Sequence, residues 1–209
     1  MHTPNKLNTH TILLAGGKGT RMLSKKAKVL QKLAGKSLLE YILCSAEEIS
    51  NKISVIVGFD KPNVENEVSK VSNKAKIYTQ KDQVGTADAV KTVIDIIDDD
   101  EKVLILYGDV PLIKANTLKS LCLLNDSISI LTTNLDDPSG YGRVIKDKGS
   151  HVIEIVEEKD ADTKQKDKKE VFTGVLAIKG EILKKLLPEI DNKNASKEYY
   201  LTDLIGIAY

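Results

Sequence analysis

Three glycines and several basic residues follow a short apolar run near the start of the chain. The stretch LAGGKGTRM at residues 14–22 sets Lys18 and Arg21 among these glycines. Successive backbone N–H groups in a glycine-rich turn form a concavity that binds anions, and an arginine can hold phosphate oxygens through two donors. We therefore predict a phosphate-binding loop. A plain glycine turn with solvated basic residues is the alternative that the spacing alone leaves open.

The loop fits neither of the two common phosphate-binding patterns. A P-loop requires Gly-Lys-Ser/Thr, whereas Gly17-Lys18 is followed by Gly19. The dinucleotide fingerprint requires a third glycine. Counted from Gly17, that position holds Met22, and counted from Gly16, the second glycine position holds Lys18. The spacing alone therefore does not identify the phosphate compound.

A second candidate site follows the most apolar run of the chain. The sequence YGDVP at residues 107–111 places Asp109 directly after the run 103–106. A carboxylate at the end of a buried strand can hold Mg²⁺ beside phosphates. The alternative is an aspartate that caps the following segment. The basic glycine loop favours the metal interpretation of Asp109, because one site would then combine a cation, hydrogen-bond donors and phosphates.

Strand-like runs alternate with helical patterns, which predicts an α/β fold with a Rossmann-like, mostly parallel sheet flanked by helices. The expected strands are 10–15, 53–57, 77–79, 103–106, 128–132 and 173–178. The expected helices are 38–49 after a capping box of Ser37 and Glu40, one through Val64, Val68 and Val71, one from Thr86 through Val90, Val93, Ile94 and Ile97, and then 118–124, 180–187 and 200–208. Ligands of open α/β sheets lie at the carboxyl ends of the strands. The glycine loop, Gln80 and Asp109 should therefore converge on one crevice.

The pattern changes after Gly140. Residues 140–145 and 152–156 read as two strands joined by the charged turn 146–149. We expect an antiparallel lobe on the edge of the sheet. Residues 157–170 are almost wholly charged, which predicts a solvated loop or a frayed helix.

The composition limits the class of protein. The chain has 209 residues, 41% of them hydrophobic, and a formal net charge of +1. We expect one α/β domain with a sizeable core and no overall basic field that would draw it to nucleic acid or a membrane. Cys44 and Cys122 lie in apolar stretches, so we expect both to be small buried hydrophobic residues. No run of transmembrane length and no signal-peptide core is visible, which favours a cytoplasmic location.

Taken together, these motifs resemble those of the sugar-nucleotide pyrophosphorylases, and in detail the uridylyltransferase domain of the bifunctional N-acetylglucosamine-1-phosphate uridylyltransferases. The matching stretches, which lie in the family's order, are 14–22, 28–30, 33–36, 83–86, 107–111, 140–143, 155–160, 173–174 and 198–203. A lone glycine loop would be weak support for this resemblance. The full ordered set covers nearly the whole chain and is specific.

The resemblance implies a nucleotide-diphospho-sugar transferase fold with a small antiparallel sugar-binding lobe. It also implies a reaction in which UTP and N-acetylglucosamine 1-phosphate form UDP-N-acetylglucosamine and pyrophosphate. The implied catalytic residues are Arg21 and Lys28, and Asp109 would bind the cofactor Mg²⁺. The implied nucleotide-binding residues are Leu14, Ala15, Gly16, Gly17, Lys28, Gln80, Gly85 and Thr86. The implied sugar-binding residues are Gly142, Glu157, Tyr200 and Thr202.

The chain departs from the family at several positions. Ala27 stands where a proline usually precedes the catalytic lysine, so we expect a more mobile loop. Phe172 replaces an asparagine of the sugar site, which either changes the sugar or places the ring in the core. Asp88 replaces a common histidine, and we expect it to point away from the nucleotide as a first-turn helix acid.

The end of the sequence gives a further expectation. The chain stops at Tyr209, before the family's second metal ligand and its β-helix acetyltransferase domain. We therefore expect residues 1–209 to form a single, C-terminally short nucleotidyltransferase domain, with a monomer as the default state. Asp203 reads as a helix-start acid rather than a substitute metal ligand. Two alternatives remain: a related enzyme with another sugar or base, and a nucleotide-binding module without turnover.

Overall fold

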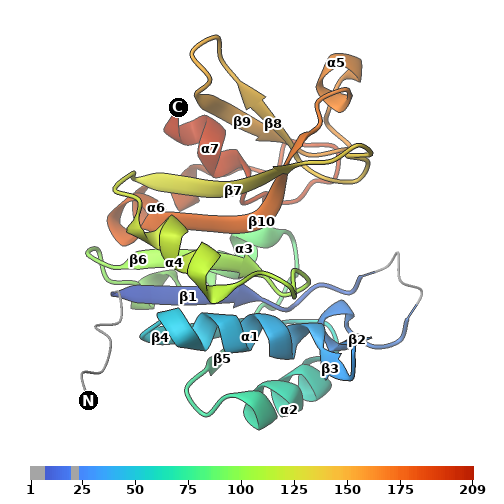
Figure 1. Cartoon of the computed structure of the whole chain (residues 1–209), viewed down its shortest axis with the longest axis vertical. Coiled ribbons are helices and arrows are strands. Elements are labelled where there is room, and N and C mark those ends of the chain that lie inside the picture. Colours follow the sequence, from blue (N-terminus) through green and yellow to red (C-terminus); the bar gives the residue numbers. More distant parts are fainter. Residues whose placement is uncertain (1–7, 20–23) are drawn as a thin grey trace.

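An eight-stranded mixed sheet forms the centre of the computed structural model, which describes residues 8–19 and 24–209 (Figure 1). The strands are β1 (Thr9–Leu14), β4 (Lys52–Val57), β5 (Lys76–Thr79), β6 (Lys102–Tyr107), β7 (Ile128–Asn134), β8 (Arg143–Lys146), β9 (Val152–Val156) and β10 (Glu170–Lys179). Their order is β5-β4-β1-β6-β10-β8-β9, with β7 paired to β10. The first four strands are parallel, whereas β7 to β10 pair antiparallel. The predicted α/β class and the antiparallel edge are confirmed.

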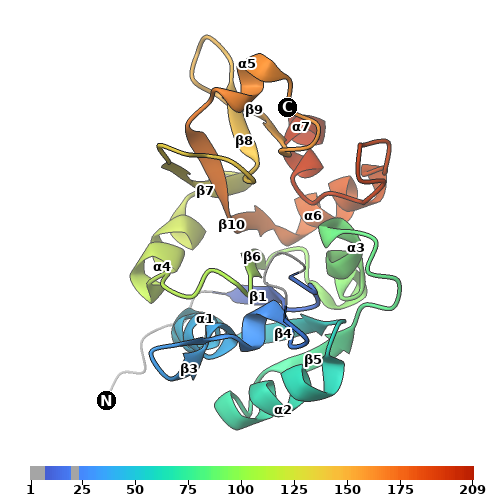
Figure 2. The same cartoon turned by 90° about the vertical axis from the view of Figure 1, so that its right-hand side faces the viewer.

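Helices cover both faces of the sheet (Figure 2). The α-helices are α1 (Leu38–Ile49), α2 (Lys61–Val71), α3 (Thr86–Lys91), α4 (Ala115–Leu123), α5 (Thr163–Lys166), α6 (Gly180–Leu186) and α7 (Asp203–Ala208). One hydrophobic cluster packs α1, α2 and α4 on one face, and a second packs α3, α6 and α7 on the other. The central strands are near-continuous apolar runs because both of their faces are buried.

Short elements complete the chain. The 3₁₀ turns are η2 (Lys28–Leu30), η3 (Ile94–Ile96) and η4 (Leu187–Glu189), and a small ribbon joins β2 (Lys32–Leu33) to β3 (Lys36–Ser37). The helix expected from Thr86 through Ile97 ends at Lys91, and η3 follows it. No helix among the described residues is long and apolar enough to span a membrane.

Strand β10 joins the two halves of the sheet. Its C-terminal part pairs with β6, its N-terminal part contacts β8 through Val171 and Arg143, and its pairing with β7 shifts register between Phe172 and Leu176. Gly174 lies in this irregularity with a φ of +82°, and a Cβ there would lie 2.8 Å from the Tyr107 ring. Only glycine fits this close approach and this conformation.

Two local expectations are corrected. Ser37 Oγ accepts from the Glu40 N–H at 3.0 Å, but the Glu40 carboxylate pairs with Lys36 at 2.9 Å, so the reciprocal half of the predicted capping box is wrong. Cys122 is buried as expected, whereas Cys44 is exposed. The prediction for Cys44 was wrong because its position lies off the face of α1 that carries the buried residues Ile42, Leu43 and Ala46.

Candidate active site

The carboxyl ends of β1 and β6 open into a cavity of about 250 Å³. Leu14 and Tyr107, the last residues of the two strands, are register partners. The residues that line the cavity are Leu14, Gly17, Gly19, Lys28, Val29, Thr86, Tyr107 and Asp109. The structure thus brings the glycine loop and Asp109 to one crevice, as the sheet topology predicted, and adds Lys28 to them. Gln80, the third expected member, does not line this cavity and lies beside Gly16 instead.

The glycine loop is held by backbone contacts with the neighbouring strand. The Ala15 N–H donates to Ile56 O at 2.8 Å, and Gly16 O accepts from the Phe59 N–H at 3.0 Å. A Cβ on Gly17 would have nothing within 4 Å, so this position faces open space. The Lys18 ammonium lies over the Phe59 ring, 5.5 Å from its centroid.

Arg21, the other predicted catalytic residue, lies outside the described residues. Gly19, the last described residue of the loop, has a φ of +64°, and a Cβ there would lie 2.6 Å from Lys28 Cβ. The glycine therefore allows the loop to lie directly against Lys28.

Lys28 begins η2 and forms an ion pair with Asp109. The two side chains are 38% and 27% exposed, so both can reach a ligand. Gly108 brings Asp109 close, because a Cβ at residue 108 would lie 2.8 Å from Val29 Cγ1 and 3.0 Å from Leu14 O. The close packing of this turn holds the backbone next to Asp109 against β1 and η2.

The loop before Lys28 has its own restraint. Ala27 is fully buried, and its N–H donates to Asp60 Oδ2 at 3.1 Å. A proline could not make this bond because it has no N–H. The structure therefore ties the loop through Asp60, where the missing proline had led us to expect mobility.

The donor set for a metal is small. The described residues contain no cluster of three or more His, Cys, Asp or Glu side chains that could hold a metal ion. Mg²⁺ is commonly held by one or two carboxylates, with waters and substrate phosphates completing its coordination. Asp109 beside the glycine loop fits such a site and does not fit an all-protein cage.

The predicted base-binding residues lie on a segment that docks against the C-terminal part of the chain. The Tyr199 N–H donates to Val84 O at 2.8 Å, and the Ala87 N–H donates to Tyr199 O at 2.9 Å. Gly85 has a φ of +131°, and a Cβ there would lie 2.3 Å from Tyr199 O. The Thr86 hydroxyl accepts from the Leu201 N–H at 2.9 Å. Tyr199 was missed because it acts through its backbone, which no side-chain motif reveals.

Gln80 follows β5 and contacts the first turn of α3. Its Nε2 donates to Asp88 Oδ2 at 2.8 Å and to Gly85 O at 2.9 Å. Asp88 lies in the first turn of α3, as expected, but its carboxylate turns toward Gln80, one of the predicted base-binding residues. The amide of Gln80 supplies two donors that a carboxylate and a carbonyl can accept, and this attraction turns Asp88 inward.

The predicted sugar-binding residues form a second cluster. Thr202 Oγ1 donates to Glu157 Oε1 at 3.0 Å, and a Cβ on Gly142 would lie 3.6 Å from that same oxygen. Burial raises the pKa of Glu157, and the hydrogen bond from Thr202 opposes that rise. Tyr200 is half-buried, and burial raises its pKa also. The structure thus brings Gly142, Glu157 and Thr202 together.

Arg143 is a residue that the sequence reasoning missed. It is 2% exposed, its Nη1 donates to Tyr141 O, and its Nη2 donates to Glu158 Oε2 at 2.7 Å. The Gly140 N–H donates to the same carboxylate oxygen at 3.0 Å. This ion pair closes the turn that carries Gly142. The only signal in the sequence was the arginine that ends the matching stretch 140–143.

Tyr107 links the two ends of the crevice. Burial raises the pKa of its phenol, and the nearby carboxylates of Glu157 and Asp109 raise it further. Its ring meets Phe172 edge to face, with centroids 6.1 Å apart. Phe172 is 7% exposed and belongs to the core, which is one of the two outcomes that the sequence left open.

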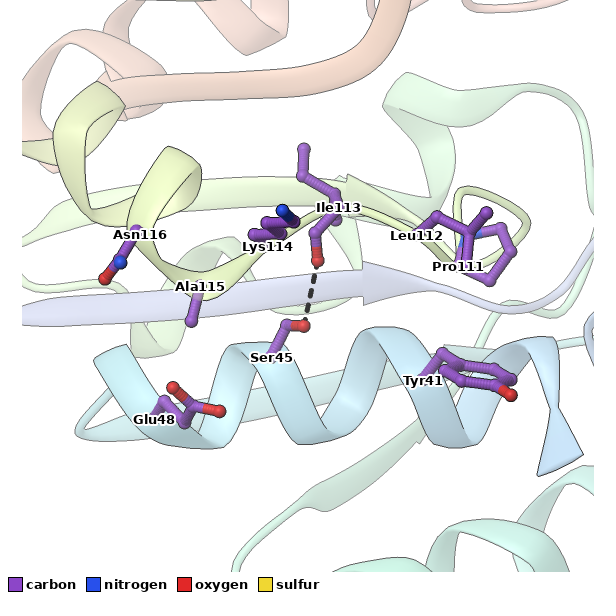
Figure 3. Close-up of a pocket in the computed structure, with 9 residues that line it drawn as sticks. All are labelled: Tyr41, Ser45, Glu48, Pro111, Leu112, Ile113, Lys114, Ala115 and Asn116. Carbon is purple, nitrogen blue, oxygen red and sulfur yellow. Dashed lines mark hydrogen bonds between the residues drawn. The ribbon is translucent and has the colours of Figure 1, made fainter.

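A separate hollow lies between α1 and the segment that follows Asp109 (Figure 3). Ser45 Oγ donates to Ile113 O at 2.9 Å across it. This bond ties the segment before α4 to the helix beneath it. The hollow carries one ammonium, Lys114, and one carboxylate, Glu48, and no glycine loop, so it lacks the features of the main crevice.

Comparisons with known proteins identify relatives of this chain. A bifunctional protein GlmU of Hydrogenovibrio crunogenus is 44% identical over 203 residues, which cover 95% of this chain and 44% of that protein. A bifunctional protein GlmU of Saccharophagus degradans is 46% identical over 200 residues, with 94% and 44% coverage. The chain therefore spans less than half the length of these relatives.

The solved structures agree on the fold. A UDP-glucose pyrophosphorylase in complex with UDP-glucose superposes with a TM-score of 0.77 at 17% identity, covering 96% of this chain and 86% of that one. The family profile described as nucleotidyl transferase matches residues 10–208. The match includes every described strand and helix, apart from the first residue of β1, and on this basis the chain belongs to the nucleotidyl transferase family.

Proposed function

We propose that residues 1–209 form one nucleotidyltransferase domain, a uridylyltransferase that makes UDP-N-acetylglucosamine and pyrophosphate from UTP and N-acetylglucosamine 1-phosphate. The observation that carries this proposal is the crevice itself. The Lys28–Asp109 pair and the glycine loop lie in the same cavity as Thr86 and Tyr107. Thr86 belongs to the segment that carries the predicted base-binding residues. Tyr107 lies near Glu157, one of the predicted sugar-binding residues. A nucleotide and a sugar phosphate would meet between these two clusters.

The nucleoside is assigned to the loop and to the segment that follows β5. Leu14, Ala15, Gly16 and Gly17 would contact the base and ribose mainly through their backbone. Gln80, Gly85 and Thr86 would read the uracil. A wrong base would leave buried polar groups unpaired, which is an efficient basis for discrimination.

The phosphates are assigned to Lys28 and Arg21. A sugar phosphate oxygen would attack the α-phosphorus of UTP in line, while the bond to the bridging oxygen breaks and pyrophosphate leaves. No covalent enzyme intermediate is needed, so the chain acts by positioning and by stabilising charge. The Lys28 ammonium would neutralise charge that develops on the phosphate oxygens.

The metal is assigned to Asp109. The family generally uses a divalent metal ion, and we propose Mg²⁺ because a single carboxylate beside phosphates suits that ion. When bound, it would supply positive charge to the phosphate oxygens. To bind the metal ion, the carboxylate of Asp109 would give up its ion pair with Lys28.

The sugar is assigned to the cluster of Gly142, Glu157, Tyr200 and Thr202. The Glu157 carboxylate would accept from sugar hydroxyls, and Thr202 orients it. We further propose that UTP and the sugar 1-phosphate are the small-molecule partners of a monomeric, cytoplasmic domain.

A second candidate is a related enzyme that uses another sugar 1-phosphate. Phe172 favours it, because an apolar ring stands where the amide of the family's sugar site is expected. Its ring packs on Tyr107 within the core, so this position offers no polar side chain to a sugar.

The decisive experiment is a pyrophosphate-release assay with UTP, Mg²⁺ and a panel of sugar 1-phosphates. We expect N-acetylglucosamine 1-phosphate to give the highest kcat/KM. A faster reaction with glucose 1-phosphate would favour the second candidate. If no sugar gives pyrophosphate while calorimetry detects UTP binding, the chain is a nucleotide-binding module and the proposed function is wrong.

A further inference from the structure

The amide of Gln80 has one fixed orientation. Gln80 is 6% exposed, and its Nε2 donates one hydrogen to Asp88 and the other to Gly85 O. A carboxylate and a backbone carbonyl can only accept. The nitrogen must therefore face them, because the reverse orientation would set the amide oxygen against two other oxygens.

The carbonyl oxygen of Gln80 is directed toward the glycine loop. A Cβ on Gly16 would lie 3.3 Å from Gln80 Oε1, so the absence of a side chain at Gly16 leaves room in front of this oxygen. Both amide hydrogens are already used on the other side. A base that reaches this point thus meets a hydrogen-bond acceptor and no donor.

We propose that Asp88 is a positioning residue that sets the base specificity of the site, by holding Gln80 so that it offers only a carbonyl acceptor. This inference rests on the proposed function and deepens it. A base is favoured when its pairing edge carries an imide N–H, as uracil does at N3. Cytosine is rejected, because its N3 is an acceptor that would face another acceptor.

The charge of Asp88 is what makes the orientation strict. A hydrogen bond to a carboxylate is stronger than one between neutral groups. Gly85 O alone also favours the observed orientation, but with a single neutral bond. Without the carboxylate, the amide of Gln80 can turn and offer its nitrogen to cytosine N3.

The test compares UTP with CTP in variants of Asp88. We expect Asp88→Ala to lower the ratio of kcat/KM for UTP to kcat/KM for CTP by about 10-fold or more, the effect of losing one hydrogen bond to a charged group. Asp88→Asn should fall between the native chain and the alanine variant, because its side-chain carbonyl can still accept. The change should lie in KM for the nucleotide, with kcat for saturating UTP altered less than about threefold. Asp82→Asn, an exposed change on the same loop, controls for the loss of a negative charge.

Calorimetric titration with UTP and CTP separates the possible failures. If the native chain prefers UTP and Asp88→Ala keeps that preference undiminished, the positioning role is wrong while the proposed function stands. The same holds if kcat collapses with an unchanged ratio, which is the signature of a merely structural role. If the native chain binds neither nucleotide, the proposed function fails and the inference fails with it.

Discussion

The ammonium of Lys28 contacts the carboxylate of Asp109, although 81 positions of sequence separate the two residues. The contact exists because β1 and β6 are adjacent parallel strands, and both residues follow their carboxyl ends. Each group cancels the charge of the other while both stay partly exposed. Ligand phosphates would attract Lys28 and a metal ion would attract Asp109, so we expect the pair to separate when substrates bind.

The first prediction concerns this pair. Lys28→Ala and Asp109→Ala should each lower the rate of pyrophosphate release by at least ~10²-fold, the scale of losing one transition-state stabiliser. Lys26→Ala is the matched control, because Lys26 is exposed and only two residues away. Initial rates at saturating UTP measure the effect. Unchanged rates in both variants would contradict the roles assigned to these residues.

The second prediction concerns the tether between Ala27 and Asp60. Asp60 has a φ of 57°, so glycine fits its backbone and removes only the carboxylate, whereas asparagine tolerates this conformation and keeps an acceptor. The glycine variant loses the bond from the Ala27 N–H and also the exposed bond from Asn63 Nδ2 at 2.6 Å. Loss of the part-buried bond from Ala27, of ~1 kcal/mol, corresponds to about fivefold. We expect Asp60→Gly to lower kcat/KM by about that factor and to speed hydrogen exchange at the Ala27 amide.

Asp60→Asn serves as the control for this experiment. It should stay within about twofold of the native chain, since its side-chain oxygen can still accept from the Ala27 N–H. Equal losses in the glycine and asparagine variants would argue against the tether, because they would show that the carboxylate charge matters rather than the bond.

Local patterns predicted most of the fold. The apolar runs of β1, β4 and β6 are long, and periodicity in α1 and α2 is strong, so these elements were found within a few residues. The convergence of the glycine loop and Asp109 followed from the rule that parallel strands end at one edge of a sheet. These inferences depend only on residues that are close together in the sequence and on the order of the strands.

Contacts between distant segments could not be predicted in this way. The contact between Asp88 and Gln80 was not predicted because Gln80 lies on another element, and the helix pattern carries no information about it. Arg143 and Tyr199 were missed for a related reason: one pairs its buried guanidinium with the partly exposed Glu158, and the other acts through its backbone. Tertiary partners decide where such groups point, and a single sequence does not contain that pairing.

The third prediction concerns the pH dependence of sugar binding. Burial raises the pKa of Glu157, while the hydrogen bond from Thr202 lowers it. Protonation turns a carboxylate that accepts into a group that also donates, so KM for the sugar 1-phosphate should rise on acidification. Because the pKa of Glu157 is raised, this rise should begin at a higher pH than it would with an ordinary glutamate. Glu157→Gln should have a high KM that no longer varies over this range.

Changes at Thr202 sharpen this test. Thr202→Val removes the hydrogen bond that lowers the pKa of Glu157, so the rise in KM should move to higher pH. Thr202→Ser keeps a hydroxyl and should leave the profile in place. Identical pH profiles in the native chain and in Glu157→Gln would rule out a titrating Glu157 as the cause.

The last prediction concerns stability and Asp203, the first residue of α7. Burial, and then the negative charge of Glu157, raise the pKa of Asp203 from 3.8 to about 6. The folded state therefore binds this proton more tightly than the unfolded state. Its contribution to stability is complete below the unfolded pKa and is lost as the pH rises through about 6.

Asp203→Asn removes this titration while keeping the shape of the side chain. We expect the variant to gain Tm relative to the native chain as the pH rises from 5 to 8, because only the native chain must then hold a partly buried charge near Glu157. The helix N-terminus favours an acid at Asp203 and opposes this gain, but charge–dipole interactions at exposed termini are typically under ~1 kcal/mol. Thermal unfolding followed by circular dichroism at several pH values measures the difference, with the exposed change Glu189→Gln as control. A Tm difference that stays constant from pH 5 to 8 would mean that Asp203 keeps an ordinary pKa, and that Glu157 does not act on it.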